Sequence, residues 1–249
     1  MGMVLAVNGK GGTGKTTVAS LMISHIASRG RGSILAVDAD PNYTLASAFG
    51  MRLEHTMVGV IDETSLKKAN IPGGMSKDRF IALRVQESIV EGDDFDLLAM
   101  GRPEGPGCYC YVNNVLRDIL SNVMSGYDFL VIDNAAGMEH ISRRTERVID
   151  RFVLVSDYSI IGVRSCGQIY SLAKELGIKI GRAFLIVNKC SGTLEPLAKE
   201  IESSGIELAG AIDYNEELVC LSVANRSIRE LKDAGPRDSM AKIMEKILL

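Results

Sequence analysis

A glycine-rich segment between residues 8 and 17 carries the clearest chemical signal in this chain. Gly9 is followed, after four residues, by Gly14-Lys15-Thr16, which satisfies the phosphate-loop pattern. Glycines let the backbone bend around a polyphosphate so that N–H groups point inward, and the helix that follows adds its positive dipole end. The alternative is a glycine-rich turn without a ligand. The expected nucleotide contacts in this loop are Gly9, Gly11, Gly12, Thr13, Gly14, Lys15, Thr16 and Thr17.

Two side chains of this loop are expected to act on the phosphates. Lys15 would neutralise the outer phosphates, and the Thr16 hydroxyl would ligate Mg²⁺. A second lysine, Lys10, cannot easily reach its own phosphates while Lys15 occupies that place, so it is free to act elsewhere. The string Gly-Lys-Gly-Gly-Thr-Gly-Lys-Thr resembles the loop of the MinD/ParA/nitrogenase iron-protein superfamily. That resemblance implies a homodimer in which Lys10 crosses the interface to the partner's nucleotide.

Aspartates follow two buried apolar runs, residues 34–37 and 127–132. Carboxylates at the C-terminal ends of parallel strands face the ligand crevice of the sheet. Asp133 is typical of an acid that holds Mg²⁺ through a bound water. Asp40 resembles the superfamily's switch I aspartate, which implies that it positions the attacking water. Asp38 either faces the ligand or caps a helix or turn, and the sequence favours neither.

The residues after Asp133 carry a further resemblance. Asp-Asn-Ala-Ala-Gly, residues 133–137, is similar to the switch II segment of the same superfamily. The resemblance implies that the amide of Gly137 senses the γ-phosphate and that the loop moves when this phosphate leaves. The catalytic residues expected on these grounds are Lys10, Lys15 and Asp40, and the reaction is slow hydrolysis of ATP to ADP.

The segment around Asn188 favours adenine as the base. Guanine-binding loops add an aspartate three residues after the asparagine, but Asn-Lys-Cys-Ser stands at residues 188–191. An asparagine side chain offers the donor and the acceptor that the adenine edge needs. Asn188 and Lys189 are therefore expected at the nucleotide. Residues 210–215 resemble another adenine-side segment, in which Asp213 replaces a common proline.

Two cysteines, Cys108 and Cys110, follow a turn rich in proline and glycine. We expect them near a helix start, where the dipole lowers the thiol pKa and favours thiolate. Two thiolates are half of the four-ligand set that Zn²⁺ or nickel prefers, and a two-fold dimer would supply the other half. The alternative is a pair of ordinary half-buried cysteines. That reading is the default for the other cysteines, Cys166, Cys190 and Cys220.

A closer resemblance rests on residues 101–110, which read Gly-Arg-Pro-Glu-Gly-Pro-Gly-Cys-Tyr-Cys, with Asn114, Arg117 and the Gly-Met-Glu-His of residues 137–140. Together they are similar to the carbon monoxide dehydrogenase accessory ATPases, the CooC family, over nearly the whole chain. The resemblance implies an ATP-dependent dimer that carries or helps insert nickel during maturation of a client nickel–iron–sulfur enzyme. An iron–sulfur ATP-dependent reductase is an alternative, but its second cluster cysteine belongs where Ala136 stands.

Alternation of strands and helices predicts the scaffold for these residues, an α/β fold with a single, doubly wound, mainly parallel sheet. One domain is expected over residues 1–249, with a mobile helical insert at about 50–92 to which no chemistry is assigned. The predicted strands are residues 3–7, 34–37, 95–100, 127–132, 152–156, 183–187 and 206–212. The predicted helices are residues 15–28, 111–125 and 167–176, with others on both sides of the last strand.

Composition narrows the possible partners and location. A formal net charge of −3 argues against a general nucleic-acid surface. The absence of a long apolar run or a signal peptide, and an odd count of five cysteines, predict a cytoplasmic protein. A membrane or DNA partitioning ATPase is the alternative function, because an apolar stripe lies near the C-terminus beside two lysines. Such a stripe more often packs on its own sheet; it comprises Met240, Ile243, Met244, Ile247 and Leu248.

Overall fold

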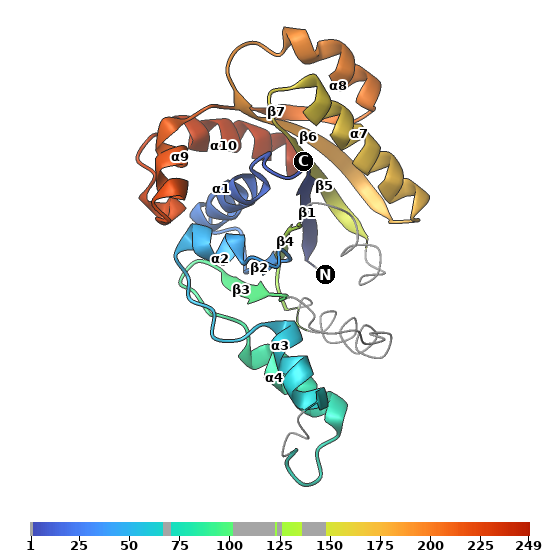
Figure 1. Cartoon of the computed structure of the whole chain (residues 1–249), viewed down its shortest axis with the longest axis vertical. Coiled ribbons are helices and arrows are strands. Elements are labelled where there is room, and N and C mark those ends of the chain that lie inside the picture. Colours follow the sequence, from blue (N-terminus) through green and yellow to red (C-terminus); the bar gives the residue numbers. More distant parts are fainter. Residues whose placement is uncertain (1, 67–70, 102–122, 124–125, 136–147) are drawn as a thin grey trace.

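The computed structural model describes residues 2–66, 71–101, 123, 126–135 and 148–249. They form a seven-stranded parallel sheet with the order β3-β2-β4-β1-β5-β6-β7, flanked by helices (Figure 1). The predicted doubly wound α/β fold is therefore confirmed. The chain builds outward from β1 in both directions, which opens a crevice at the carboxyl ends of the central strands.

The strands are mostly short apolar runs without alternation, because helices cover both faces of the sheet. Two of them begin earlier than predicted. β5 starts at Ile149 because its polar residues have partners: the Asp150 carboxylate accepts from the Val4 amide at 2.8 Å, and Arg151 Nε donates to the Ile247 carbonyl at 2.5 Å. The strands are β1 (Met3–Gly9), β2 (Ile34–Asp38), β3 (Asp96–Ala99), β4 (Phe129–Asp133), β5 (Ile149–Ser156), β6 (Ile180–Cys190) and β7 (Glu207–Asp213).

Helix ends follow local capping. α1 has the predicted bounds, and Gly30 with φ +57° ends the turn that follows it. α7 begins seven residues earlier than predicted because Ser159 caps it, accepting from the Gly162 amide at 3.0 Å. The helices are α1 (Lys15–Ser28), α2 (Thr44–Phe49), α3 (Met57–Leu66), α4 (Lys77–Glu87), α7 (Ile160–Glu175), α8 (Ala198–Ser204), α9 (Glu216–Val223) and α10 (Gly235–Ile247), with short 3₁₀ turns η1 (Glu195–Leu197) and η2 (Ile228–Glu230).

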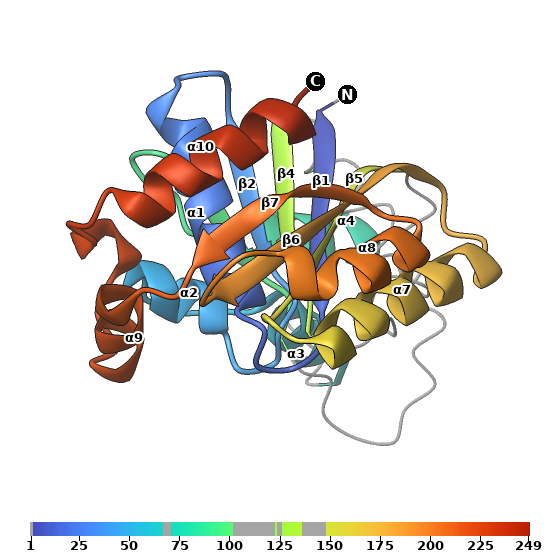
Figure 2. The same cartoon turned by 90° about the horizontal axis from the view of Figure 1, so that it is seen from above.

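The two faces of the sheet are covered differently (Figure 2). α1, α2 and α10 share one continuous apolar core with one face. On the other face, α3 and α4 pack over β2 and β3, whereas α7 and α8 pack over β5 and β6. Within the segment at 50–92, α3 and α4 place Met57, Ile61 and Val85 against the sheet, where all three are buried. This segment therefore forms part of the sheet's cover.

The apolar stripe near the C-terminus lies on α10 and faces inward. Met240, Ile243, Met244 and Ile247 are all buried, in the core shared with α1 and β7. The fit is close, since a Cβ added at Gly210 of β7 would lie 2.8 Å from an Ile243 side-chain atom. The stripe therefore stabilises the fold. Within the described ranges, no helix has the length and apolar character needed to cross a bilayer.

Candidate functional site

The phosphate loop joins the end of β1 to the start of α1 and is shaped by two glycines. Gly9 has φ +154°, and a Cβ there would lie 2.3 Å from the Val155 carbonyl oxygen. Gly14 has φ +88° and precedes the first turn of α1, and its Cβ would lie 2.3 Å from Asn188 Nδ2. Side chains are excluded at both points. The loop can therefore lie close to the neighbouring strands and to a ligand.

Side chains from β6 hold the loop's carbonyl groups. Asn188 Nδ2 donates to the Thr13 carbonyl at 2.9 Å, and Lys189 Nζ donates to the Gly12 carbonyl at 2.8 Å. Lys189 adopts φ +55°, an uncommon backbone conformation for a residue with a Cβ. These bonds orient the loop through its carbonyl groups and use none of its amide groups. The sequence predicted nucleotide contacts for Asn188 and Lys189, and the structure places both side chains against the loop. The bond to the Thr13 carbonyl uses the amide nitrogen of Asn188 and not its acceptor oxygen.

Two aspartates end adjacent strands in register, since Asp133 of β4 pairs with Asp38 of β2. Asp133 is 1% exposed; its Oδ2 accepts from the Thr16 hydroxyl at 2.7 Å. Its Oδ1 is buried and has no hydrogen-bond partner among the described residues. Burial, together with the charge of Asp38, raises the pKa of Asp133 to about 7. A buried carboxylate oxygen without a partner costs free energy, and this one would suit a bound water or cation.

Asp38 has a different environment. Its Oδ2 accepts from the amides of Leu45 and Ala46 at 2.9 and 3.2 Å, and its Oδ1 accepts from the Asp40 amide at 3.1 Å. Burial still raises its pKa to about 6. Of the two readings that the sequence left open, the structure supports the cap: Asp38 holds the start of α2 and the loop that carries Asp40.

Asp40 and Lys15 both border the crevice in front of the loop. Asp40 Oδ1 accepts from the backbone and side-chain nitrogens of Asn42 at 2.8 and 2.9 Å. Lys15 is 9% exposed, and its Nζ donates to the Lys10 carbonyl at 3.3 Å. Burial lowers the pKa of Lys15, while the charges of Asp133 and Asp40 oppose that shift. One lysine thus faces two carboxylates, which leaves negative charge for a divalent cation to balance.

The donor set fits Mg²⁺. Thr16 Oγ1 lies 3.1 Å from Thr44 Oγ1 as well as against Asp133, so hydroxyl and carboxylate oxygens gather beside the loop. Mg²⁺ prefers oxygen ligands and keeps several waters or phosphate oxygens. In the described ranges, no group of three or more His, Cys, Asp or Glu side chains could hold a metal ion. Mg²⁺ would therefore share its coordination between Thr16, a water on Asp133 and the phosphates.

A cavity of about 460 Å³ opens in front of the loop, within the range of small-molecule sites. One wall comes from the end of β7 and from α9, where Tyr214, Val219 and Val223 are 53%, 40% and 83% exposed. Exposed apolar and aromatic groups beside a phosphate loop suit a planar base. Asp213 also lines this cavity, a position that the resemblance of residues 210–215 had left open.

Several cavity residues were not found from the sequence. Thr44 enters because Asp38 folds α2 back over the loop, and the α9 side chains enter because Asn215 caps that helix, accepting from the Leu218 amide at 3.0 Å. A polar cap residue after a strand was the only available signal for α9. Lys10 is exposed at the loop's rim, and its ammonium has no partner among the described residues. Its action on a partner subunit stays a prediction.

The predicted metal ligands Cys108 and Cys110, and the predicted γ-phosphate sensor Gly137, lie outside the described residues. The other three cysteines are free thiols. Cys166 is buried, which raises its pKa to about 12, and Cys190 donates to the Gly192 carbonyl at 3.0 Å. Neither has the character of a metal ligand.

Comparison with known proteins extends these observations. A family model described as an AAA domain matches residues 1–180. An uncharacterized ATP-binding protein from Methanocaldococcus jannaschii is 40% identical over 222 residues, covering 87% of this chain and 86% of that protein. The carbon monoxide dehydrogenase accessory protein CooC from Rhodospirillum rubrum is 28% identical over 257 residues, covering 99% and 96%.

The fold also matches solved structures. The MinC:MinD cell division protein complex from Aquifex aeolicus superimposes with a TM-score of 0.72 at 16% identity, over 100% of this chain and 96% of that one. At this identity the likeness concerns the fold alone. It places the seven-stranded sheet and its phosphate loop among MinD-like and ParA-like folds.

Proposed function

This chain belongs to the AAA domain family of MinD-, ParA- and CooC-like P-loop ATPases, and from that premise we propose that it is a slow, magnesium-dependent ATPase that works in metal handling as a nucleotide-switched homodimer. ATP binding follows from the family and from the phosphate loop. The hydrolytic step, the dimer and the metal cargo are what we propose in addition.

The hydrolytic part of the proposal rests on Asp133, whose buried Oδ1 has no hydrogen-bond partner in the described part of the chain. On nucleotide binding, the Thr16 hydroxyl would exchange its bond to Asp133 for Mg²⁺, and Asp133 would hold the metal through a water. Bound Mg²⁺ supplies neutralisation of phosphate oxygens as charge develops in the transition state. Lys15 would hold the outer phosphates, and Asp40 would orient the attacking water and accept its proton.

Lys10 is proposed to act on the partner subunit's nucleotide. Its exposure at the rim is compatible with that reach. A cation placed only against transition-state charge affects rate more than ground-state affinity. Lys10→Ala should therefore leave ATP affinity nearly unchanged while phosphate release falls, whereas Lys199→Ala, at an exposed lysine of α8, should change neither. Equal losses of affinity and rate would contradict the trans role.

The metal-handling part rests on Cys108 and Cys110 and on the similarity to CooC over nearly the whole chain. If each subunit contributes two thiolates, a dimer binds one Zn²⁺ or Ni²⁺ with four soft ligands. We propose nickel delivery to a nickel–iron–sulfur enzyme of the carbon monoxide dehydrogenase type as the task. Metal and ATP should both favour the dimer, because each binds across the interface.

Metal analysis of the purified protein tests this part. One tightly held divalent ion per dimer is expected, and it should be lost in a Cys108→Ser and Cys110→Ser double variant. The matched control is Cys220→Ser, which changes an exposed free cysteine elsewhere. One ion per monomer, or binding unchanged in the double variant, would overturn the shared-thiolate site while leaving the ATPase proposal standing.

The partitioning alternative lacks its main sequence support, since the C-terminal stripe is buried in the core. A helix that uses its apolar face for folding cannot offer the same face to lipid without detaching. Co-sedimentation with liposomes in the presence of ATP would separate the two functions. The proposed function predicts no ATP-dependent pelleting.

A further inference from the structure

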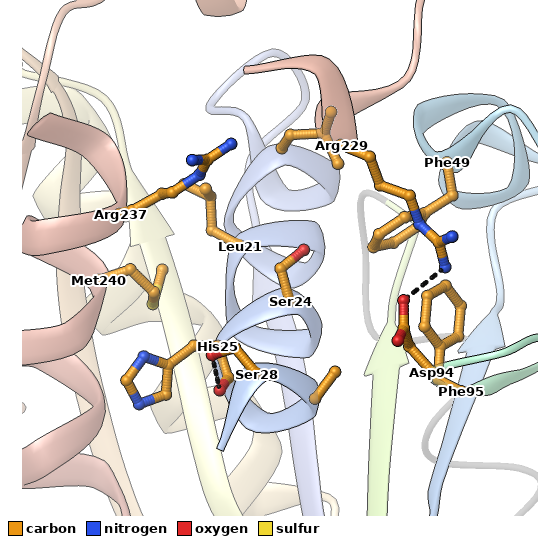
Figure 3. Close-up of a pocket in the computed structure, with 12 residues that line it drawn as sticks. Leu21, Ser24, His25, Ser28, Phe49, Asp94, Phe95, Arg229, Arg237 and Met240 are labelled. Atoms are coloured by element: carbon orange, nitrogen blue, oxygen red, sulfur yellow. Dashed lines mark hydrogen bonds and ion pairs between the residues drawn. The ribbon is translucent and has the colours of Figure 1, made fainter. Parts of the chain in front are cut away.

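A second cavity, of about 400 Å³, lies on the outer side of α1, away from the phosphate loop. Figure 3 shows α1 between α10, which carries Arg237 and Met240, and a wall formed by Phe49, Asp94, Phe95 and Arg229. We call this cavity the α1 groove. Its volume lies within the range of small-molecule sites, and none of its lining residues borders the nucleotide cavity.

The base of the α1 groove is apolar. Leu21, Phe49, Phe95 and Met240 are each at most 5% exposed, yet all four border the open volume. The Phe49 and Phe95 rings pack with centroids 4.5 Å apart. Burial of an apolar group against this base would remove further apolar surface from water. The groove therefore favours a ligand with an apolar body.

The charges around the groove are unequally balanced. On one side Arg229 forms an ion pair with Asp94 at 3.1 Å and lies over the Phe49 and Phe95 rings, so its charge has a partner. On the opposite side Arg237 donates one N–H to the Leu231 carbonyl and has no carboxylate partner in the described part of the chain. One uncompensated guanidinium thus remains in the lining.

Two further polar groups lie on α1 between these walls. The side chains of Ser24 and His25 make no hydrogen bond with any described residue, although the His25 carbonyl accepts from the Ser28 hydroxyl at 2.9 Å. Burial, with the charges of Arg29 and Arg31 against that of Glu245, lowers the pKa of His25, which keeps its ring neutral at pH 7. The His25 ring therefore adds no positive charge to that of Arg237.

We propose that the α1 groove binds a small organic monocarboxylate, with the carboxylate on Arg237 and the apolar body across Met240 and Leu21, beside Ser24. One uncompensated cation matches one negative charge, and a charge-assisted bond to guanidinium favours a planar carboxylate. The apolar base gives no hydrogen bonds, so inorganic phosphate alone would gain little.

The test uses 2-naphthoate as the probe and 2-naphthamide as its neutral counterpart, each titrated calorimetrically into the full-length protein. The carboxylate should bind roughly tenfold more tightly than the amide, because only the carboxylate makes a charged bond. In Arg237→Gln that preference should fall to about one, since glutamine can still donate to the Leu231 carbonyl but carries no charge. Arg164→Gln, on α7, is the matched control and should keep the preference.

A second variant blocks the groove without removing a charge. Ser24→Leu fills the volume over α1 and breaks no described side-chain hydrogen bond, so it should weaken both probes. Saturating ATP should leave naphthoate binding unchanged. Absent binding at millimolar naphthoate, equal affinities for the two probes in the unaltered protein, full binding in Ser24→Leu, or displacement of naphthoate by ATP would each overturn the proposal.

Discussion

The ends of β2 and β4 offer two aspartates in nearly the same position with different tasks. Asp38 and Asp133 are register neighbours, both are almost fully buried, and burial raises the pKa of both. Asp38 accepts three backbone amides. Asp133 accepts from one hydroxyl, and its other oxygen is buried without a partner among the residues that the structure describes. The first carboxylate completes the fold, whereas the second leaves a vacant acceptor beside the phosphate loop.

Burial and a raised pKa do not by themselves identify a reacting acid. Both carboxylates have these properties because both lie at the carboxyl ends of adjacent interior strands. Hydrogen-bond satisfaction separates them, since both oxygens of Asp38 accept from backbone amides, whereas Oδ1 of Asp133 has no partner among the described residues. Substitution of each aspartate in turn should therefore affect turnover and stability differently.

The largest effect is expected on turnover. Asp133→Asn keeps the size of the side chain and an acceptor for Thr16, but it removes the charge that would hold Mg²⁺. We expect phosphate release to fall about 100-fold or more, the scale seen when one electrostatic contact to a transition state is lost. Phosphate release from Asp38→Asn should fall much less. A larger loss in Asp38→Asn would reverse the assignment of the two roles.

For stability we expect the opposite order, with the larger loss on substitution of Asp38. Asp38→Ala leaves three amides without their acceptor, two of them in buried hydrogen bonds, so it should lower the free energy of unfolding by about 2–3 kcal/mol. Asp133→Ala removes the acceptor of a single hydroxyl, which can turn to Thr44, and it also removes a desolvated charge. Its net cost should stay below about 1 kcal/mol. Urea denaturation of the two variants without nucleotide gives the comparison, and equal costs would contradict it.

Lys189 of β6 also has a supporting role, because its ammonium group donates to the loop's Gly12 carbonyl. Lys189→Met keeps much of the side-chain length but loses that bond and the charge. ATP affinity should fall roughly tenfold because the loop is no longer held in its binding shape. The control is Lys199→Met, at an exposed lysine, which should bind ATP normally. Unchanged affinity in Lys189→Met would mean that Gly12 needs no support.

A further comparison is the pH dependence of stability. Burial raises the pKa of Asp133 to about 7 from an ordinary 3.8, so between these values the folded state binds a proton that the unfolded state lacks. The free energy of unfolding should therefore increase as pH falls from about 7 towards 4, and this group should contribute at most about 1.4 kcal/mol per pH unit. Asp133→Asn should lack that contribution. The free energy of unfolding of both proteins is measured against pH without Mg²⁺ or nucleotide. The same pH dependence in both would contradict a raised pKa at Asp133.

Much of the site could be predicted because its signals are local. The spacing of Gly9, Gly14 and Lys15 specifies the loop, and apolar runs ending in aspartate specify where the strands deliver their acids. The parallel sheet follows from strands without alternation. These features depend on neighbouring residues, so a short stretch of sequence contains them.

The remaining features depend on tertiary packing. Asp38 could not be assigned before α2 was seen to fold its first amides onto the carboxylate. Thr44 reaches the site only through that same fold, and Asn188 was expected to face a base although its amide nitrogen holds Thr13. Each depends on residues distant in sequence. Spacing alone carries no information about such contacts.

The most direct test of the magnesium site is the ATP affinity of the unaltered protein and of Asp133→Asn, each measured by calorimetry with Mg²⁺ and with a chelator. In the unaltered protein Mg²⁺ should tighten ATP binding, because Thr16 and Asp133 offer oxygens to the metal only when phosphates complete its coordination. In Asp133→Asn that gain should largely disappear, while affinity in chelator stays the same or rises. An undiminished Mg²⁺ gain in Asp133→Asn would contradict the assignment of the unpartnered oxygen to the metal.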